Sequence, residues 1–239
     1  MNRIQKFNTF NEGVTTNDKY TFIKKLTKMV VDGKLTSLII TGEGGIGKTY
    51  TVMNIINKYA KKDDIYVVKG YSTPKGLYNI LYEHNGQVIV FDDCDSVLDD
   101  KVAINILKSA LDSYDKRTIT WSKSVTKNDT IPTQFDFNGR VIFISNKSKD
   151  FFDKAILSRC VFVDLTMTND EKLNRMYEIL PNLLPDYDVD TKIKALSFLY
   201  TNKDIEGINL NIRTLIKLIK IIGSYPNDWQ DLAEYTIKS

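Results

Sequence analysis

A glycine-rich run that ends in lysine and threonine is the part of the chain with the clearest chemistry. The run GEGGIGKT fits the pattern GxxxxGKT. Glycines let phosphate oxygens approach backbone N–H groups and permit the positive φ angles of such a loop. Lys48 would bring a mobile positive charge to the β and γ phosphates, and Thr49 would offer its hydroxyl to Mg²⁺. We expect ATP to bind this run and the residue after it: Gly42, Glu43, Gly44, Gly45, Ile46, Gly47, Lys48, Thr49 and Tyr50.

Two consecutive aspartates, Asp92 and Asp93, end a second apolar run. Carboxylates at the carboxyl end of a buried strand lie where open α/β sheets bind their ligands, so we expect this pair beside the phosphate-binding run. Asp92 would hold Mg²⁺ through water, and Asp93 would orient or deprotonate an attacking water. The alternative is a solvated acidic turn that opens the next helix, with Asp99 and Asp100 as caps. We favour the role in metal binding and water activation.

Short apolar runs alternate with helical patterns through the first two thirds of the chain. Apolar strands flanked by helices imply a parallel sheet covered on both faces, and hence a three-layer α/β core. The predicted strands occupy residues 37–41, 65–68, 87–91, 140–145 and 161–165.

The strand pattern stops near Met167, and helical patterns follow near residues 169–180, 190–200 and 211–223, with a further one toward the end. We therefore predict two domains. Residues 1–166 form the α/β core with an N-terminal lead and a hairpin inserted near 114–139. Residues 167–239 form a small all-α lid domain.

Composition limits the classes of function. A chain of 239 residues, 42% of them hydrophobic, suffices for one sizeable core and a small second domain. A net charge of +3 means that any nucleic-acid contact must be local. Cys94, Cys160 and the single histidine, His84, lack the spacing of a zinc site or a Cys/His nucleophile pair. The N-terminus lacks the apolar core of a signal peptide, and no run reaches about 18 apolar residues. We expect a cytoplasmic protein with no membrane partner.

With these motifs in place, roughly residues 20–225 resemble AAA+ ATPases, a family of P-loop NTPases. Asn146 resembles the polar residue called sensor 1, which helps to position the attacking water. Ser158-Arg159-Cys160 resembles the SRC motif of clamp-loader subunits, whose arginine reaches into a neighbouring subunit's nucleotide site. Arg213 resembles the sensor 2 arginine of the lid domain.

The resemblance implies a catalytic set of Lys48, Asp93, Asn146, Arg159 and Arg213, with Thr49 and Asp92 at the metal. One departure concerns the acidic pair, because most of the family has Asp-Glu there. Aspartate is one methylene shorter than glutamate, so water activation would be slower or would fall partly to Asp95.

The region 114–139 reads as a β-hairpin because Thr118 to Trp121 alternate in character. Hairpins at this place occur in helicase-related members of the family. Basic residues with an aromatic could line a pore and touch DNA by charge and stacking: Lys116, Arg117, Trp121, Lys123 and Lys127. The alternative is a solvated hairpin whose aromatics pack on the sheet. Tyr71 and Lys75 occupy the loop where many AAA+ rings carry an aromatic that grips the substrate.

The resemblance implies an ATPase that binds and hydrolyses ATP with Mg²⁺ as a homo- or hetero-oligomer, in which Arg159 completes the neighbour's site. Such a protein remodels or loads a macromolecular partner, and the process that we expect is DNA replication, as a clamp-loader-like or helicase-loader-like factor encoded by a phage. Two alternatives stay open: a protein-remodelling ATPase that threads polypeptide with Tyr71, and a nucleotide-gated structural component.

Overall fold

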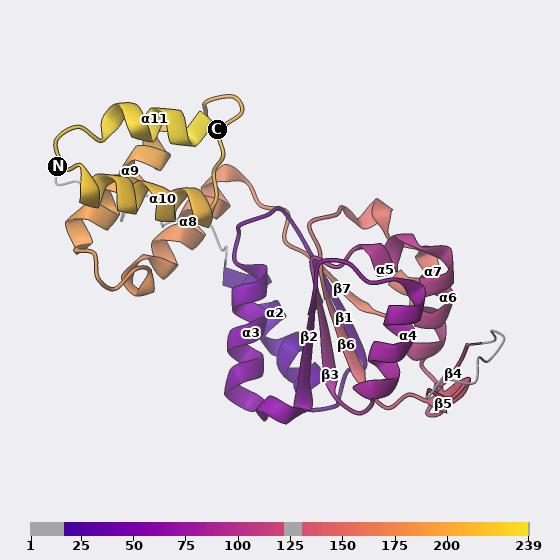
Figure 1. Cartoon of the computed structure of the whole chain (residues 1–239). Coiled ribbons are helices and arrows are strands. Elements are labelled where there is room, and N and C mark those ends of the chain that lie inside the picture. Colours follow the sequence, from indigo (N-terminus) through magenta and orange to yellow (C-terminus); the bar gives the residue numbers. More distant parts are fainter. Residues whose placement is uncertain (1–16, 122–130, 239) are drawn as a thin grey trace. The chain divides into compact units, whose positions relative to one another are not determined.

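The computed structural model describes residues 17–121 and 131–238, and its larger unit is built around a five-stranded parallel sheet (Figure 1). The strand order is β2-β3-β6-β1-β7, and every neighbouring pair is parallel. All residues of β1 and β3 are buried, and the strands are apolar except at their ends, Ser37 and Thr41 in β1 and Asp92 in β3. The predicted parallel α/β fold is therefore confirmed. The strands are β1 (Ser37–Thr41), β2 (Ile65–Lys69), β3 (Val88–Asp92), β6 (Arg140–Ile144) and β7 (Val161–Asp164).

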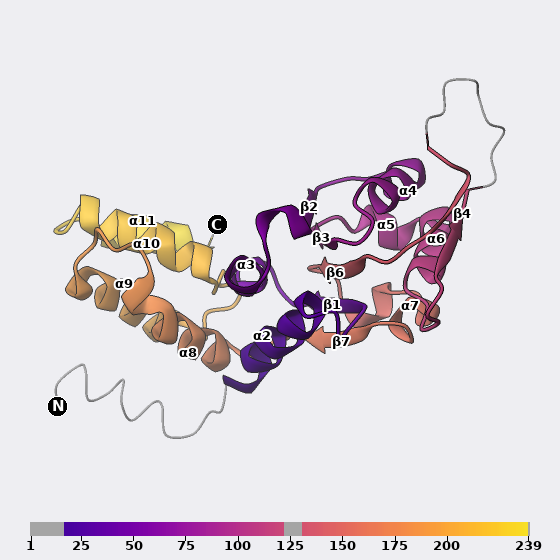
Figure 2. The same ribbon diagram turned by 90° about the horizontal axis from the view of Figure 1, so that it is seen from below.

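Helices cover both faces of this sheet, as the two views show (Figures 1 and 2). One face carries α2 (Asn17–Val31) and α3 (Lys48–Tyr59). The other face carries α4 (Pro74–Glu83), α5 (Ser96–Asp99), α6 (Lys101–Ala110) and α7 (Lys154–Leu157). Short 3₁₀ helices lie at η1 (Lys62–Asp64) and η2 (Lys149–Phe151). In the described part of the chain, no helix is both long and apolar enough to cross a membrane.

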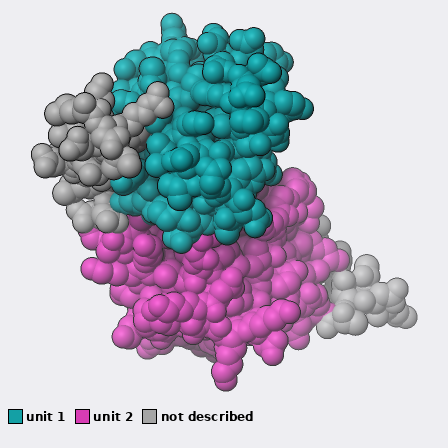
Figure 3. Space-filling model, turned by 90° about the vertical axis from the view of Figure 1, so that its left-hand side faces the viewer, with its two compact units in different colours: residues 1–18, 44–47, 167–239 teal, residues 19–43, 48–166 magenta. Residues whose placement is uncertain are grey.

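The remaining helices form a separate compact unit, α8 (Asn169–Ile179), α9 (Val189–Asn202), α10 (Ile212–Ser224) and α11 (Gln230–Lys238), with a 3₁₀ turn η3 (Leu180–Asn182) (Figure 3). Its core is mainly leucine and isoleucine from the apolar faces of these helices. Thr168 and Glu171 form a reciprocal capping box at the start of α8. Of the described residues, this unit holds 17–18, 44–47 and 167–238, and the sheet unit holds 19–43, 48–121 and 131–166.

The predicted hairpin is an antiparallel pair, β4 (Thr118–Thr120) with β5 (Gln134–Asp136). Its apolar side chains face inward: Ile119 is fully buried, and Phe135 lies edge-on to the Tyr78 ring of α4 at 5.3 Å between centroids. Trp121 packs on the same core, 5.7 Å from the Tyr78 ring. The hairpin aromatics therefore pack on the α/β core, as the second alternative held, although their main partner is α4 and not the sheet itself.

The prediction that Arg117 contacts nucleic acid is wrong. Its guanidinium is buried and donates hydrogen bonds to the carbonyls of Ala110 and Gly139, both at 2.9 Å. Burial lowers the pKa of Arg117, and the charge of Arg140 adds to that effect. Lys116 is exposed, with its ammonium 3.3 Å from the Asp136 carboxylate. Lys123 and Lys127 lie outside the described residues.

Arg117→Ala should lower the free energy of unfolding by about 2–4 kcal/mol, because two buried carbonyls lose a charged donor. The adjacent Lys116→Ala is the matched control and should cost less than about 0.5 kcal/mol, since its ion pair is exposed to solvent. Urea denaturation followed by circular dichroism measures both. Equal effects of the two substitutions would contradict a structural role for Arg117.

Candidate functional site

The loop between β1 and α3 has a backbone that only glycine adopts without strain. Gly45 and Gly47 have φ angles of 75° and 93°. A Cβ on Gly45 would lie 3.0 Å from the Asn211 side chain, so a larger residue there would also crowd Asn211. The Gly45 carbonyl accepts a hydrogen bond of 3.0 Å from the N–H of Ile212, at the start of α10. The loop tip is thus fixed by α10 within the unit to which residues 44–47 belong.

Lys48, the cation at the end of the loop, is buried and held by hydrogen bonds. Only 5% of its surface is exposed. Its Nζ donates to the carbonyls of Gly42 and Glu43 at 2.7 and 2.8 Å, and to Oδ1 of Asn146 at 2.7 Å. All three acceptors are neutral oxygens. A negatively charged phosphate oxygen would bind the ammonium more strongly than any of them.

Thr49 and Asp92 bring two hard oxygen ligands together. The Thr49 hydroxyl donates to Oδ1 of Asp92 at 2.6 Å, and Asp92 is 6% exposed. Mg²⁺ is typically held by one or two protein oxygens together with phosphate oxygens and water. This donor pair fits that ion, and it joins the first turn of α3 to the end of β3.

Asn146 bridges the phosphate-binding lysine and the second aspartate. Its Oδ1 accepts from Lys48, and its Nδ2 donates to Oδ1 of Asp93 at 2.8 Å. The strand order explains the bridge, because β6 lies between β1 and β3 and Asn146 follows β6 closely. Asp93 has a φ of 53°, in the left-handed region, and its N–H donates to the Ile144 carbonyl at 3.0 Å. The backbone is thus held in a sparsely populated conformation that turns the carboxylate toward Asn146.

The other aspartates of this segment have different surroundings. Asp100 caps α6 by accepting from the N–H groups of Val102 and Ala103 at 2.7 and 2.9 Å, as the structural alternative held for it. Asp99 is the last residue of α5, and the cap of the following helix is Asp100. Asp95 precedes α5, and its buried Oδ1 has no hydrogen-bond partner among the described residues. Asp93, by contrast, accepts a hydrogen bond from Asn146, which also contacts Lys48.

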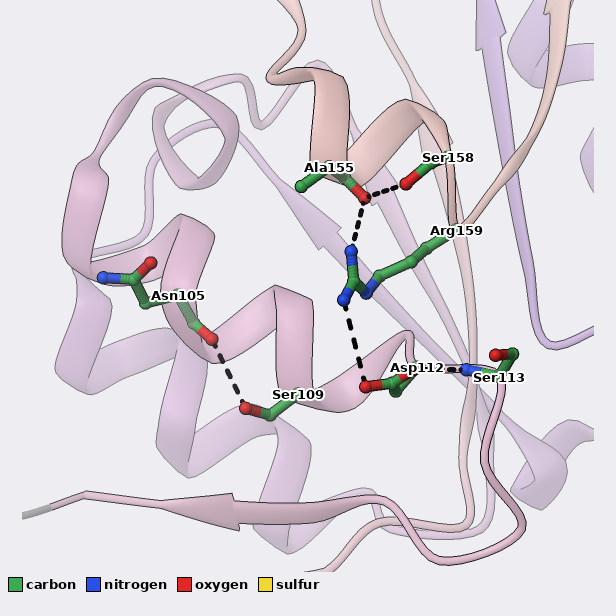
Figure 4. Close-up of polar contacts among 7 residues, drawn as sticks. All are labelled: Asn105, Ser109, Asp112, Ser113, Ala155, Ser158 and Arg159. Carbon is green, nitrogen blue, oxygen red and sulfur yellow. Dashed lines mark hydrogen bonds and ion pairs between the residues drawn. The ribbon is translucent and has the colours of Figure 1, made fainter.

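Arg159 is held by contacts within its own chain (Figure 4). Its Nη1 donates to the Ala155 carbonyl at 3.0 Å, and its Nη2 lies 3.9 Å from Oδ2 of Asp112. The Ala155 carbonyl also accepts from the Ser158 hydroxyl at 2.9 Å. A role in a neighbour's site would require the guanidinium to leave Ala155 and Asp112.

Three further candidates are exposed. Arg213 lies in the first turn of α10, Tyr50 is 64% exposed on α3, and Tyr71 is 77% exposed on the loop after β2. All three side chains are therefore accessible to a partner molecule.

Neither cysteine is suited to nucleophilic chemistry. Burial raises the pKa of the Cys94 thiol, and it raises the pKa of Cys160 to about 11. Both thiols are therefore protonated at neutral pH, whereas the thiolate is the reactive form.

Sequence reasoning missed Lys69, the last residue of β2. Its Nζ lies 3.3 Å from Oδ2 of Asp92. Lys69 directly follows an apolar run, as Asp92 does, so both were identifiable as strand-end residues. Their pairing depends on the adjacency of β2 and β3, which the sequence alone does not contain.

Comparisons with known proteins agree with this geometry. The family model described as Novel STAND NTPase 3 matches residues 23–128. A protein of Enterobacteria phage T4, described as an uncharacterized 36.7 kDa protein in the nrdC-mobD intergenic region, is 30% identical over 243 residues, covering 91% of this chain and 73% of that protein.

Two solved structures share the fold. One is RuvB of Thermotoga maritima, a Holliday junction branch migration motor, with a TM-score of 0.58 and 16% identity over 91% of this chain and 68% of that one. The other is NtrX of Brucella abortus in complex with ATP, with a TM-score of 0.53 and 12% identity over 90% of this chain and 53% of that one.

Proposed function

The chain belongs to the family of this phage T4 protein and is a phage-like P-loop NTPase of the AAA+ type, and from this premise we propose that it binds ATP with Mg²⁺ and hydrolyses it as an oligomer. The observation that carries the proposal is the bridge of Asn146 between Lys48 and Asp93, beside the Thr49–Asp92 pair. A phosphate-binding cation, a pair of metal ligands and a candidate base are thereby joined in one connected group.

Each residue has a distinct role in the proposed reaction. Lys48 exchanges neutral carbonyl partners for phosphate oxygens, and this places its charge where negative charge gathers during phosphoryl transfer. Thr49 and Asp92 would hold Mg²⁺, which when bound neutralises phosphate charge. Asp93 accepts a proton from, or orients, the attacking water, and Asn146 holds that carboxylate at a fixed distance from Lys48.

Asp93→Asn should keep ATP binding and lower the hydrolysis rate at least tenfold, or about 1.4 kcal/mol of barrier, because an amide cannot take the proton. Asp95→Asn is the matched control, and we expect a smaller effect there. Phosphate release measured at saturating ATP and Mg²⁺ gives both rates. A larger loss in Asp95→Asn would assign the base to Asp95.

The oligomer is proposed from the position of Arg159. In its own subunit the guanidinium donates one hydrogen bond to the Ala155 carbonyl and lies near Asp112, so an approaching neighbour would compete with that bond and with an ion pair. The ion pair is long and partly exposed and contributes little free energy, so the carbonyl bond is the main contact that release must replace. Arg213 and Tyr50 are proposed as further contacts to the nucleotide, from the first turns of α10 and α3.

The partner that we propose is DNA, in a loading or remodelling step of replication, in the cytoplasm of a phage-infected host. RuvB is a DNA-junction motor, and this likeness favours DNA over polypeptide. The competing proposal is polypeptide threading, which the exposed Tyr71 favours. ATPase rates with single-stranded DNA, double-stranded DNA and an unfolded protein separate the two. No stimulation by any of them would favour a nucleotide-gated structural component.

A further inference from the structure

Lys69 and Asp92 are direct neighbours at the ends of adjacent strands. The β2–β3 register pairs Lys69 with Asp92, and the Nζ–Oδ2 distance is 3.3 Å. The lysine side chain is 69% exposed, whereas that of Asp92 is 7% exposed. A solvated cation therefore meets a buried carboxylate from the solvent side.

Both oxygens of the carboxylate are thereby engaged. Oδ1 accepts from Thr49, and Oδ2 faces the Lys69 ammonium. A divalent cation bound by Thr49 and Asp92 would lie close to that ammonium. Like charges at such a distance repel each other, and one carboxylate cannot neutralise both.

We propose that Lys69 is a positioning residue that neutralises Asp92 in the absence of a metal and must leave it when Mg²⁺ binds, so that Lys69 sets the Mg²⁺ concentration which the site requires. This inference rests on the proposed Mg²⁺–ATP site. The local backbone suits such a movement, because Gly70 follows with a φ of 85° and open space around it. Ser72 is anchored two residues further on, where its N–H donates to the Ser96 hydroxyl at 3.0 Å.

The experiment titrates Mg²⁺ into protein with a fluorescent ATP analogue, which measures binding and not turnover. Lys69→Met keeps most of the aliphatic stem and removes the charge. Lys62→Met removes an equal charge in η1, which directly precedes β2, and is the matched control. Urea denaturation of all three proteins checks that they are folded.

We expect Lys69→Met to lower the Mg²⁺ concentration for half-maximal binding about three- to fivefold, the size that an exposed ion pair allows, while Lys62→Met matches the wild type. An unchanged or higher Mg²⁺ requirement in Lys69→Met, with Mg²⁺-dependent binding in the wild type, would overturn the role of Lys69 and leave the site intact. Analogue binding that is independent of Mg²⁺ in the wild type would overturn both.

Discussion

Lys48→Ala protein should bind ATP at least a hundredfold more weakly than the wild type. The lysine residue is 5% exposed, and its Nζ lies within 2.8 Å of three oxygens, two of which are carbonyls that phosphate oxygens would replace. A charge-assisted hydrogen bond to phosphate is worth about 1.5–3 kcal/mol, and about 2.7 kcal/mol corresponds to a hundredfold change in affinity. The substitution also leaves Asn146 without its partner on that side, which should loosen Asp93.

Titration with a fluorescent ATP analogue measures this loss. Lys58→Ala, in the last turn of the same helix, is the matched control, because it removes an equal charge on the exposed part of α3. Its affinity should stay within about twofold of the wild type, since a distant exposed charge is screened. Unchanged affinity in Lys48→Ala would remove the central part of the proposed function.

Arg159→Ala should retain ATP binding and lose turnover by at least about a hundredfold, because a guanidinium is suited to neutralise charge on the transferring phosphate. The proposed site of action is the neighbouring subunit. In its own subunit the side chain is engaged with the Ala155 carbonyl and Asp112 (Figure 4). Mixing Arg159→Ala with Lys48→Ala should therefore restore some activity, since a mixed interface joins an intact loop to an intact arginine.

Specific activity should also rise with protein concentration, because an isolated subunit lacks a complete site. Lys154→Ala, an exposed change in the short helix that precedes Arg159, controls for general damage to α7 and should leave turnover near that of the wild type. Thermal unfolding of Arg159→Ala checks that loss of the Asp112 contact has not unfolded the chain. Concentration-independent activity together with no rescue on mixing would leave Arg159 a structural residue.

The sequence by itself determined that the core is a parallel sheet, the order of its strands and helices along the chain, and the position of the glycine-rich loop. These features are local: strands buried on both faces are mostly apolar, as β1 and β3 are between their polar ends, and a loop with positive φ at Gly45 and Gly47 must be glycine-rich. The acidic pair was also visible, because both residues come at the end of an apolar run. The cap at Asp100 followed from the same local logic.

Only the tertiary structure decided which of these residues touch one another. The position of β6 between β1 and β3 lets Asn146 bridge Lys48 and Asp93, and the adjacency of β2 and β3 brings Lys69 to Asp92. Arg117 and Lys116 are both basic and adjacent in sequence. Arg117 is buried and donates to two carbonyls, whereas Lys116 is exposed. Such outcomes depend on which strands become neighbours and which carbonyls would otherwise be buried without a donor, and these are properties of the folded chain that no local pattern encodes.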